Sequence, residues 1–288
     1  MENIIFDPPT RFDFKCAEYV PFKDREVCER LRKISGKDLE KHANPDFNIK
    51  VMQNPHPVLI ATLFSRIKEA SENGKKITLI LGNPEPETYQ SGFAHSMLKY
   101  LVYQIDPKLR MPMKNVNYPT NKNIAYYSDM ITDCGEGGAD ICSSSPGWTG
   151  HMAFIDPVPE FLGNKEILTS LDDEYFDQKA KVVKLHPLTV AQNSLHGVFG
   201  QSGYIADVPP CAATIGPYDV KNARERIEVH ALLTNCTFSS WQRMTSRLVL
   251  HGPVTPLVPS SMLQLMKTQV YVSEELAAPF DCWEQVGY

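Results

Sequence analysis

The sequence lacks an excess of positive charge and a long apolar run. Its 288 residues carry 29 Lys and Arg against 34 Asp and Glu, a formal net charge of −5. We find no cluster of basic residues along the chain, which argues against nucleic acid and anionic membranes as partners. Apolar runs such as residues 77–81 are much shorter than the roughly 20 residues of a membrane helix, and the N-terminus does not resemble a signal peptide.

The seven cysteines are also uninformative as a set, because they are odd in number, scattered, and form no Cys-x-x-Cys pair. Such a distribution indicates neither a disulfide framework nor a zinc site. We therefore expect free thiols, a cytoplasmic protein, no bound metal and no cofactor. The composition, 42% hydrophobic and 22% charged, is typical of a soluble globular protein with one large or two small domains.

The first 46 residues differ in pattern from the rest of the chain. Residues 1–23 are rich in proline and aromatic side chains without a clear period, which predicts an extended arm. Residues 24–33 predict a charged helix, and Ser35-x-x-Asp38 resembles a capping box that opens a second short helix. The sequence thus predicts an N-terminal region at 1–46, followed by one α/β domain at 47–288.

From residue 47 onward, strand and helix patterns alternate. This order predicts an α/β fold of the Rossmann-like, three-layer type, with a mostly parallel sheet covered by helices on both faces. Ligands of such sheets bind beyond the carboxyl ends of the strands, which directs attention to the loops after residues 81, 143, 185 and 233. We expect strands at 47–52, 77–81, 139–143, 181–185, 226–233 and 269–272, and helices at 55–71, 89–104, 122–132, 187–195 and 239–250.

The loop at residues 143–157 carries the most chemistry. Gly147 and Gly150 permit backbone conformations that other residues resist and allow a ligand to approach the main chain. His151 can exchange protons near neutral pH, and Asp156 is close enough in sequence to orient an imidazole or to act as an acid or base. From spacing alone, a glycine-rich turn with a structural histidine explains the loop equally well.

These residues form the pattern Gly-x-x-Gly-His-x-Ala-Phe-x-Asp-Pro, which resembles the active-site motif of the glucosamine-6-phosphate deaminase/isomerase family. Further segments resemble family landmarks in the family's order, so that the resemblance covers about residues 47–273. It implies a sugar-phosphate isomerase/deaminase fold, a small-molecule sugar phosphate as partner, and conversion of an amino-sugar phosphate to a ketose phosphate and ammonia. A homo-oligomer remains open. The further segments are residues 115–119, 185–189, 208–217 and 251–261.

The resemblance also implies roles for single residues. His151 assists ring opening, Asp156 supports it, and Thr149 stands where the family often has an acid. Arg243 is closest to the position of a phosphate-binding lysine, while a second phosphate ligand falls near residues 193–196, where no arginine occurs. The substrate-binding candidates are Gly147, Trp148, Gly150, His186, Asn193, His196 and Arg243.

Two departures from the family pattern predict impaired deamination. The family's neutral phosphate loop is replaced by a segment with Glu85 and Glu87, which would repel a phosphate. The strand end that supplies the base for the C2 proton has no counterpart between residues 81 and 87. The alternatives are a non-catalytic homologue that binds a sugar phosphate or assembles with other subunits, a sugar-phosphate lactonase-like enzyme on the same fold, or a sequence that lacks a segment of its active parent.

Overall fold

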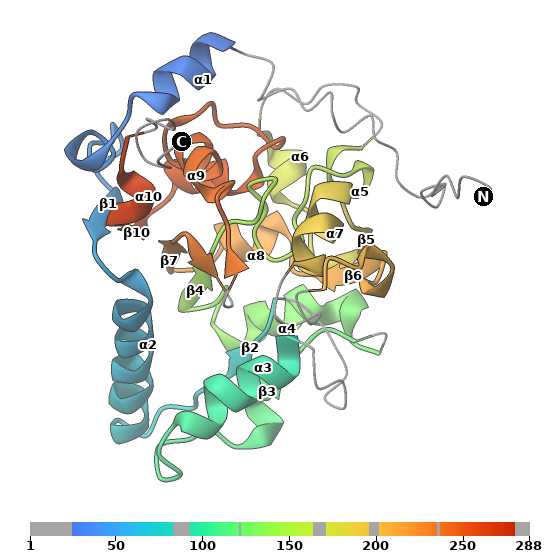
Figure 1. The fold of residues 1–288 in the computed structure, drawn as a ribbon. Coiled ribbons are helices and arrows are strands. Elements are labelled where there is room, and N and C mark those ends of the chain that lie inside the picture. The colour runs from blue at the N-terminus through green and yellow to red at the C-terminus, as the bar shows by residue number, and fades with distance from the viewer. Residues whose placement is uncertain are drawn as a thin grey trace.

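The computed structural model describes residues 25–82, 93–120, 122–163, 171–195, 202–234 and 237–279. Four strands form the central sheet in the order β1 (Phe47–Met52), β10 (Thr268–Ser273), β7 (Glu225–His230) and β4 (Ile141–Ser144), and all neighbours are parallel (Figure 1). The last of the described strands therefore lies between the first of them and β7. This parallel sheet with flanking helices confirms the predicted α/β fold.

Strand composition explains why these segments form the centre of the sheet. All of β7 except its first residue is buried, and Val270 and Val272 of β10 are inaccessible to solvent. β-branched residues pack well on a pleated surface that is covered by other elements. The expected boundaries of β1 and β10 agree with the observed ones to within one residue at each end.

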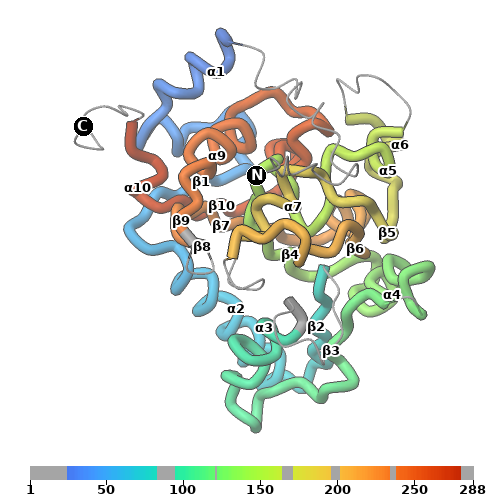
Figure 2. The backbone as a smooth tube through the Cα atoms, turned by 45° about the vertical axis from the view of Figure 1, so that its right-hand side comes forward, coloured from blue at the N-terminus to red at the C-terminus, as the bar shows by residue number. Residues whose placement is uncertain are grey.

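Helices pack against this sheet on more than one side (Figure 2). α2 (Pro55–Glu72) contacts β7 and β10, whereas α10 (Glu274–Ala277) contacts β1 and β10. α2 begins with a proline in its first turn and is followed by Gly74 at φ +66°, the left-handed residue that the Asn73-Gly74 pair predicts. α9 (Gln242–His251) packs against the 3₁₀ segment η9 (Pro259–Leu265).

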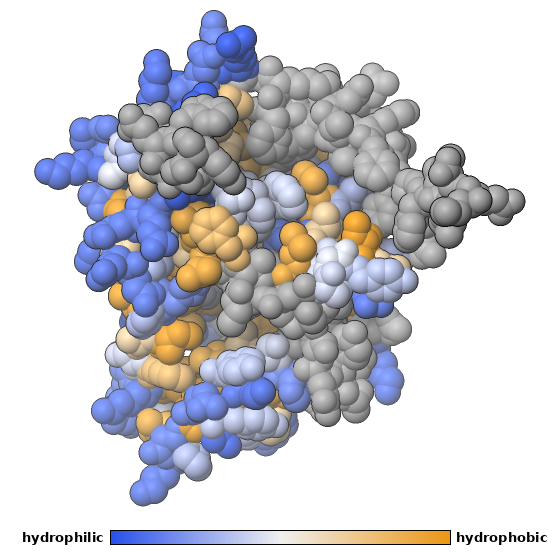
Figure 3. All heavy atoms as spheres, viewed as in Figure 1, coloured by the Kyte–Doolittle hydropathy of each residue, from blue (hydrophilic) through white to orange (hydrophobic). Residues whose placement is uncertain are grey.

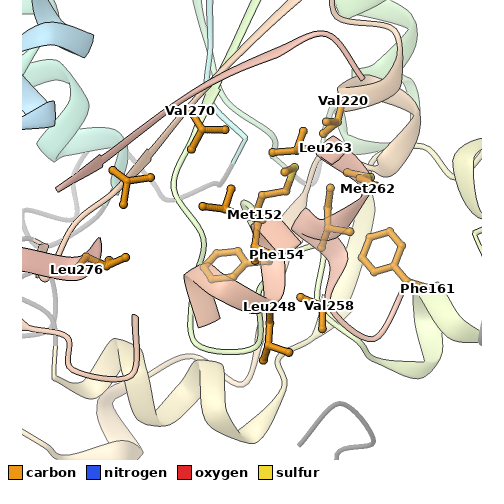
Figure 4. Close-up of a cluster of buried hydrophobic side chains, with 14 of the residues drawn as sticks. Met152, Phe154, Phe161, Val220, Leu248, Val258, Met262, Leu263, Val270 and Leu276 are labelled. Carbon is orange, nitrogen blue, oxygen red and sulfur yellow. The ribbon is translucent and has the colours of Figure 1, made fainter. Parts of the chain in front are cut away.

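The main hydrophobic core joins the central sheet to the loop that follows β4. Met152 and Phe154 of that loop are buried in one cluster with Leu248, Met262 and Val270 (Figure 4). A side chain this well packed resists displacement because protein interiors are nearly as dense as organic crystals. The segment around His151 is therefore fixed on both sides by the core.

Two predicted strands, those expected at 77–81 and at 181–185, do not join the central parallel sheet but belong to separate small sheets. β5 (Lys181–Lys184) pairs antiparallel with β6 (Cys211–Thr214), so the prediction that this segment belongs to the parallel sheet is wrong. The physical reason lies in its pattern: Val183 is buried, whereas Val182 is 51% exposed. Such alternation is typical of a strand with one solvated face.

A second small sheet lies below the central one in Figure 1, beside α3 (Phe93–Tyr100). β2 (Leu79–Ile80) pairs in parallel there with β3 (Val116–Asn117), apart from the central sheet. Leu98, Val102, Ile105 and Met111 form a separate core beside it.

Several predicted boundaries also differ from the structure. The strand expected at 226–233 ends at His230, because Leu233 opens the hairpin of β8 (Leu233–Thr234) and β9 (Thr237–Phe238). Ser35 forms no side-chain cap, so the predicted capping box is wrong and only one 3₁₀ turn follows. The predicted arm at 1–23 lies outside the described residues. The remaining elements are α1 (Arg25–Arg32), η3 (Gly36–Asp38), η4 (Val102–Gln104), η5 (Met113–Asn115), η6 (Ile124–Tyr126), α4 (Tyr127–Cys134), α5 (Pro159–Leu162), α6 (Asp173–Phe176), α7 (Pro187–Ser194), η8 (Ile205–Asp207) and α8 (Pro217–Lys221).

The surface is mixed in character on the face that Figure 3 shows. Hydrophilic side chains gather over α1, and hydrophobic ones reach the surface in the middle of the face. Within the described ranges, no helix combines the length and the apolar character that crossing a membrane requires.

Candidate functional site

The candidate site begins in the loop that follows β4, whose neighbour in the sheet is β7. The loop closes through a hydrogen bond of 2.8 Å from the Gly147 amide to the His151 carbonyl, and another of 2.9 Å from the Gly150 amide to the Gly147 carbonyl. Gly150 has φ +77°, and a Cβ atom there would lie 2.5 Å from Val258. The tight turn therefore needs glycine at position 150.

Gly147 has a different role, because its backbone lies against the imidazole of His151. A Cβ atom at position 147 would be 2.0 Å from both Cε1 and Nε2 of that ring. No positive φ is involved at this glycine, so the requirement is purely steric. The two glycines of the motif thus shape the turn and make room for the ring, respectively.

The imidazole belongs to a cluster of four buried polar side chains. His151 Nδ1 is 3.0 Å from Asp156 Oδ1. The same carboxylate oxygen accepts hydrogen bonds from the hydroxyls of Thr149, at 2.7 Å, and of Thr189, at 2.9 Å. Asp156 and Thr189 are fully inaccessible to solvent, and His151 is 5% exposed. The structure therefore places all three predicted catalytic residues together.

The hydrogen bonds also indicate the tautomer of His151. Each threonine hydroxyl has one proton and donates it to Asp156, so the short contacts from these hydroxyls to Nδ1, 2.9 and 3.1 Å, require Nδ1 to be the donor. In the neutral ring, Nε2 then carries the free lone pair. Nε2 has no hydrogen-bond partner among the described residues and is not one of the enclosed unpaired atoms. It is the nitrogen that can exchange a proton with a ligand.

Asp156 is charged in this environment. Burial is the largest single influence and raises its pKa, but His151, His186 and the Thr149 hydroxyl together outweigh it and lower the pKa below the ordinary value. Its second oxygen, Oδ2, is enclosed and has no hydrogen-bond partner. The carboxylate thus concentrates its interactions on Oδ1, where it orients the imidazole.

α7 supplies the parts of the site that lie far away in sequence. His186 caps this helix, since its Nδ1 accepts a hydrogen bond of 3.2 Å from the Leu188 amide. Burial lowers the pKa of His186, the charge of Asp156 raises it, and the net shift is downward. The next positions at intervals of three are Thr189, in the cluster, and Gln192, which contacts the motif loop. Residues three apart share one face of a helix.

A cavity of about 330 Å³ is lined by residues of the loops that follow β4 and β7 and of α7, and none of the four cluster side chains lines it. Trp148 and Trp241 stack beside it, with ring centroids 5.8 Å apart and planes at 11°. The Trp148 amide donates to Gln192 Oε1 at 2.6 Å, which ties the cavity wall to α7. Trp148 follows Gly147 directly, so the motif loop supplies one wall of the cavity. The lining residues are Trp148, Gln192, Leu195, Phe238, Ser239, Ser240 and Trp241.

A buried polar network in α9 and β7 holds the motif loop from below. Gln242 donates to the Pro146 carbonyl at 2.7 Å, and the Thr245 hydroxyl donates to the Trp148 carbonyl at 3.0 Å. Behind them, His230 bridges Ser246 and Glu228 at 2.8 and 3.0 Å. Because all three of these groups are inaccessible to solvent, they can position the loop but cannot contact a substrate.

The other predicted binding residues are placed less directly. Asn193 is buried and does not line the cavity. Arg243 does not line it either, and its Nη1 is enclosed without a hydrogen-bond partner. His196, Glu85 and Glu87 lie outside the described residues. Sequence reasoning did not single out Thr189 and Gln192, although the spacing of three from His186 on an expected helix was a usable signal.

Comparison with known proteins supports the fold. No family model and no curated protein matches the chain in sequence. Among solved structures, a monomeric glucosamine-6-phosphate deaminase is similar with a TM-score of 0.55 and 16% identity, over 88% of this chain and 95% of that one. 6-Phosphogluconolactonases from Trypanosoma cruzi and Thermotoga maritima have TM-scores of 0.47 and 0.48, identities of 14% and 13%, and cover 84% and 79% of this chain and 99% of each of those chains. At such identities, the similarity to the deaminase structure shows a common fold.

Proposed function

We propose that this chain is a sugar-processing acid–base enzyme in which His151 opens the ring of a cyclic sugar at the C1–O5 bond. The observation that carries the proposal is the free Nε2 of His151, whose other nitrogen is fixed by Asp156 in the same loop that supplies Trp148 to a cavity. A ligand beyond the carboxyl ends of the strands is the general expectation for open parallel sheets.

The proposed chemistry needs one proton-transfer group. Nε2 takes the proton from the C1 hydroxyl while the C1–O5 bond breaks, and the imidazolium returns a proton to O5, which leaves an open-chain aldehyde. Asp156 stabilises the imidazolium formed in between, because its carboxylate contacts Nδ1 at 3.0 Å. Thr149 and Thr189 keep that carboxylate in place.

Deamination of an amino-sugar phosphate is the fuller reaction that the sequence resemblance suggests. Beyond ring opening, it needs a base over C2. Among the described residues, Asp156 is the one carboxylate in the cluster, and none lines the cavity. We therefore propose that deamination by this chain is slow compared with ring opening.

Hydrolysis of a sugar lactone is a second candidate, and the single His–Asp pair specifically favours it. In this reaction, Nε2 takes a proton from the water that attacks C1 and returns it to O5 as the C1–O5 bond breaks. No second base is required, so the residues in place suffice for the complete reaction.

The proposal is tested with the intact chain on three reactions. The interconversion of the anomers of glucose and of glucosamine 6-phosphate is measured by NMR exchange. Ammonia release from glucosamine 6-phosphate is measured by a coupled assay. Hydrolysis of gluconolactone is measured by the fall in the pH of the solution as the acid forms. His151→Gln should lower ring opening or lactone hydrolysis by about 10²–10⁴-fold.

His56→Gln is the matched control, since this histidine is exposed on α2 and outside the cluster. It should leave all three reactions unchanged. Equal activity of His151→Gln and the parent, or no activity of the parent in any reaction, would contradict the proposal and favour a binding or assembly role.

A further inference from the structure

The cavity at Trp148 and Trp241 is lined by uncharged side chains alone among the residues that the structure describes. Trp148, Trp241, Phe238 and Leu195 make it largely apolar, and three neutral polar residues complete it. Phe238 and Leu195 are large apolar side chains that are 62% and 42% exposed. Exposed aromatic and aliphatic groups gathered around a cavity are typical of a ligand site.

A phosphate group would find little support here. Phosphate recognition relies on charged donors such as Arg and Lys, and none lines the cavity among the described residues. The chain segments 83–92, 196–201 and 235–236, which adjoin the lining residues in sequence or carry the expected phosphate loop, contain no Lys or Arg either. Arg243 is the nearest cation in sequence, and it does not line the cavity.

The same walls suit a sugar ring without a charge. The C–H face of a hexose is apolar and can cover an indole, while its hydroxyls need uncharged donors and acceptors. Gln192 provides such a donor, because its Oε1 is used by the Trp148 amide and its amide nitrogen has no partner in the described part of the chain. Ser240 is exposed beside Trp241 and adds a hydroxyl.

We propose that the sugar bound at this site is an uncharged, unphosphorylated aldose, with its apolar face on the Trp148–Trp241 wall. The inference rests on the proposed function for the position of the reacting C1 atom. It differs from the resemblance to the deaminase family, which implies a phosphorylated substrate. A volume of about 330 Å³ lies at the lower end of the range for ligand pockets, which fits a single sugar ring.

Glucose and glucose 6-phosphate form the matched pair of ligands, since they differ only in the phosphate. Calorimetry with the full chain should show that glucose binds at least as tightly as glucose 6-phosphate. Trp241→Ala should weaken glucose binding by about tenfold, a loss in the range of one aromatic contact. Trp241→Phe keeps an aromatic face and should retain most of the affinity, which separates a stacking role from a folding defect.

Arg243→Gln and His56→Gln are the comparison variants, and both should leave the ratio of the two affinities unchanged. Tighter binding of glucose 6-phosphate that is lost in Arg243→Gln would overturn the inference and assign a phosphate site to Arg243. Binding of neither sugar, or glucose binding that Trp241→Ala leaves intact, would overturn it as well. These outcomes can be told apart from a failure of the proposed function. The inference about the ligand fails on the binding measurements, whereas the proposed function fails if His151→Gln leaves the rate of proton transfer unchanged.

Discussion

Gly147→Ala is the substitution whose effect on the site follows most directly from the structure, because one distance, from the added Cβ atom to the His151 ring, determines it. The added Cβ atom would lie 2.0 Å from Cε1 and Nε2 of His151, whereas carbon atoms in contact are about 3.5 Å apart. The imidazole or the loop must therefore move by about 1.5 Å. Met152 and Phe154 hold the backbone on the far side in the hydrophobic core, so the ring is the part that yields.

Movement of the ring separates Nδ1 from Asp156 Oδ1, which now lie 3.0 Å apart. A misplacement of about 1 Å can lower a rate by about 100-fold. We expect ring opening or lactone hydrolysis to fall by at least that factor. Overpacking of a dense interior also destabilises by about 1–3 kcal/mol, which urea unfolding can measure.

Gly163→Ala is the matched control for this prediction. Gly163 has φ +65°, and nothing lies within 4 Å of a Cβ atom placed there. This variant should lose about 1–3 kcal/mol of unfolding free energy, because φ +65° with ψ −166° is a conformation that essentially only glycine adopts, and should keep its activity. A fully active Gly147→Ala enzyme would refute the reasoning, because the imidazole would then not occupy the position that the structure shows.

Further predictions concern the charges around the site and in the core. Asp156→Asn should reduce the proton-transfer rate by about 10²–10⁴-fold, since an amide cannot stabilise the imidazolium as a carboxylate does. An unchanged rate would show that the His151–Asp156 pair does not carry out the proton transfer. The pKa of His186 is lowered chiefly by burial, so the unfolded state takes up a proton first as pH falls through about 6.5, and stability declines on the acid side. His186→Asn, which can still cap α7, should therefore lose less unfolding free energy between about pH 7.5 and about pH 5.5 than the parent in chemical denaturation; an equal loss would contradict the assignment. Arg247 is fully buried, its pKa is lowered to about 10 chiefly by burial, and it donates to the carbonyls of Ile34, Arg243 and residues 276–278. Arg247→Met should destabilise the fold by about 3–5 kcal/mol, because several buried carbonyls lose their donors; thermal unfolding at the parent's temperature would refute this.

Local patterns in the sequence were sufficient to locate β1 and β10 and the turn that carries the motif, but not to decide which strands share the central sheet. β1 and β10 are short runs of alternating or β-branched residues whose boundaries follow from composition, and the Asn73-Gly74 pair marks the end of α2. The contact of Gly147 with His151 and the φ of +77° at Gly150 are local to the motif, whereas the clash of a Cβ atom at Gly150 with Val258 depends on a segment far away in sequence.

The partners of that motif were decided by tertiary structure. Thr189 is 38 residues from His151, and Gln192 is 44 residues from Trp148, yet α7 brings both side chains into contact with the loop. The stacking of Trp148 on Trp241 likewise depends on how α9 packs beneath the loop. Such contacts arise from the packing of whole elements against one core, and local propensity along the chain does not encode which faces meet.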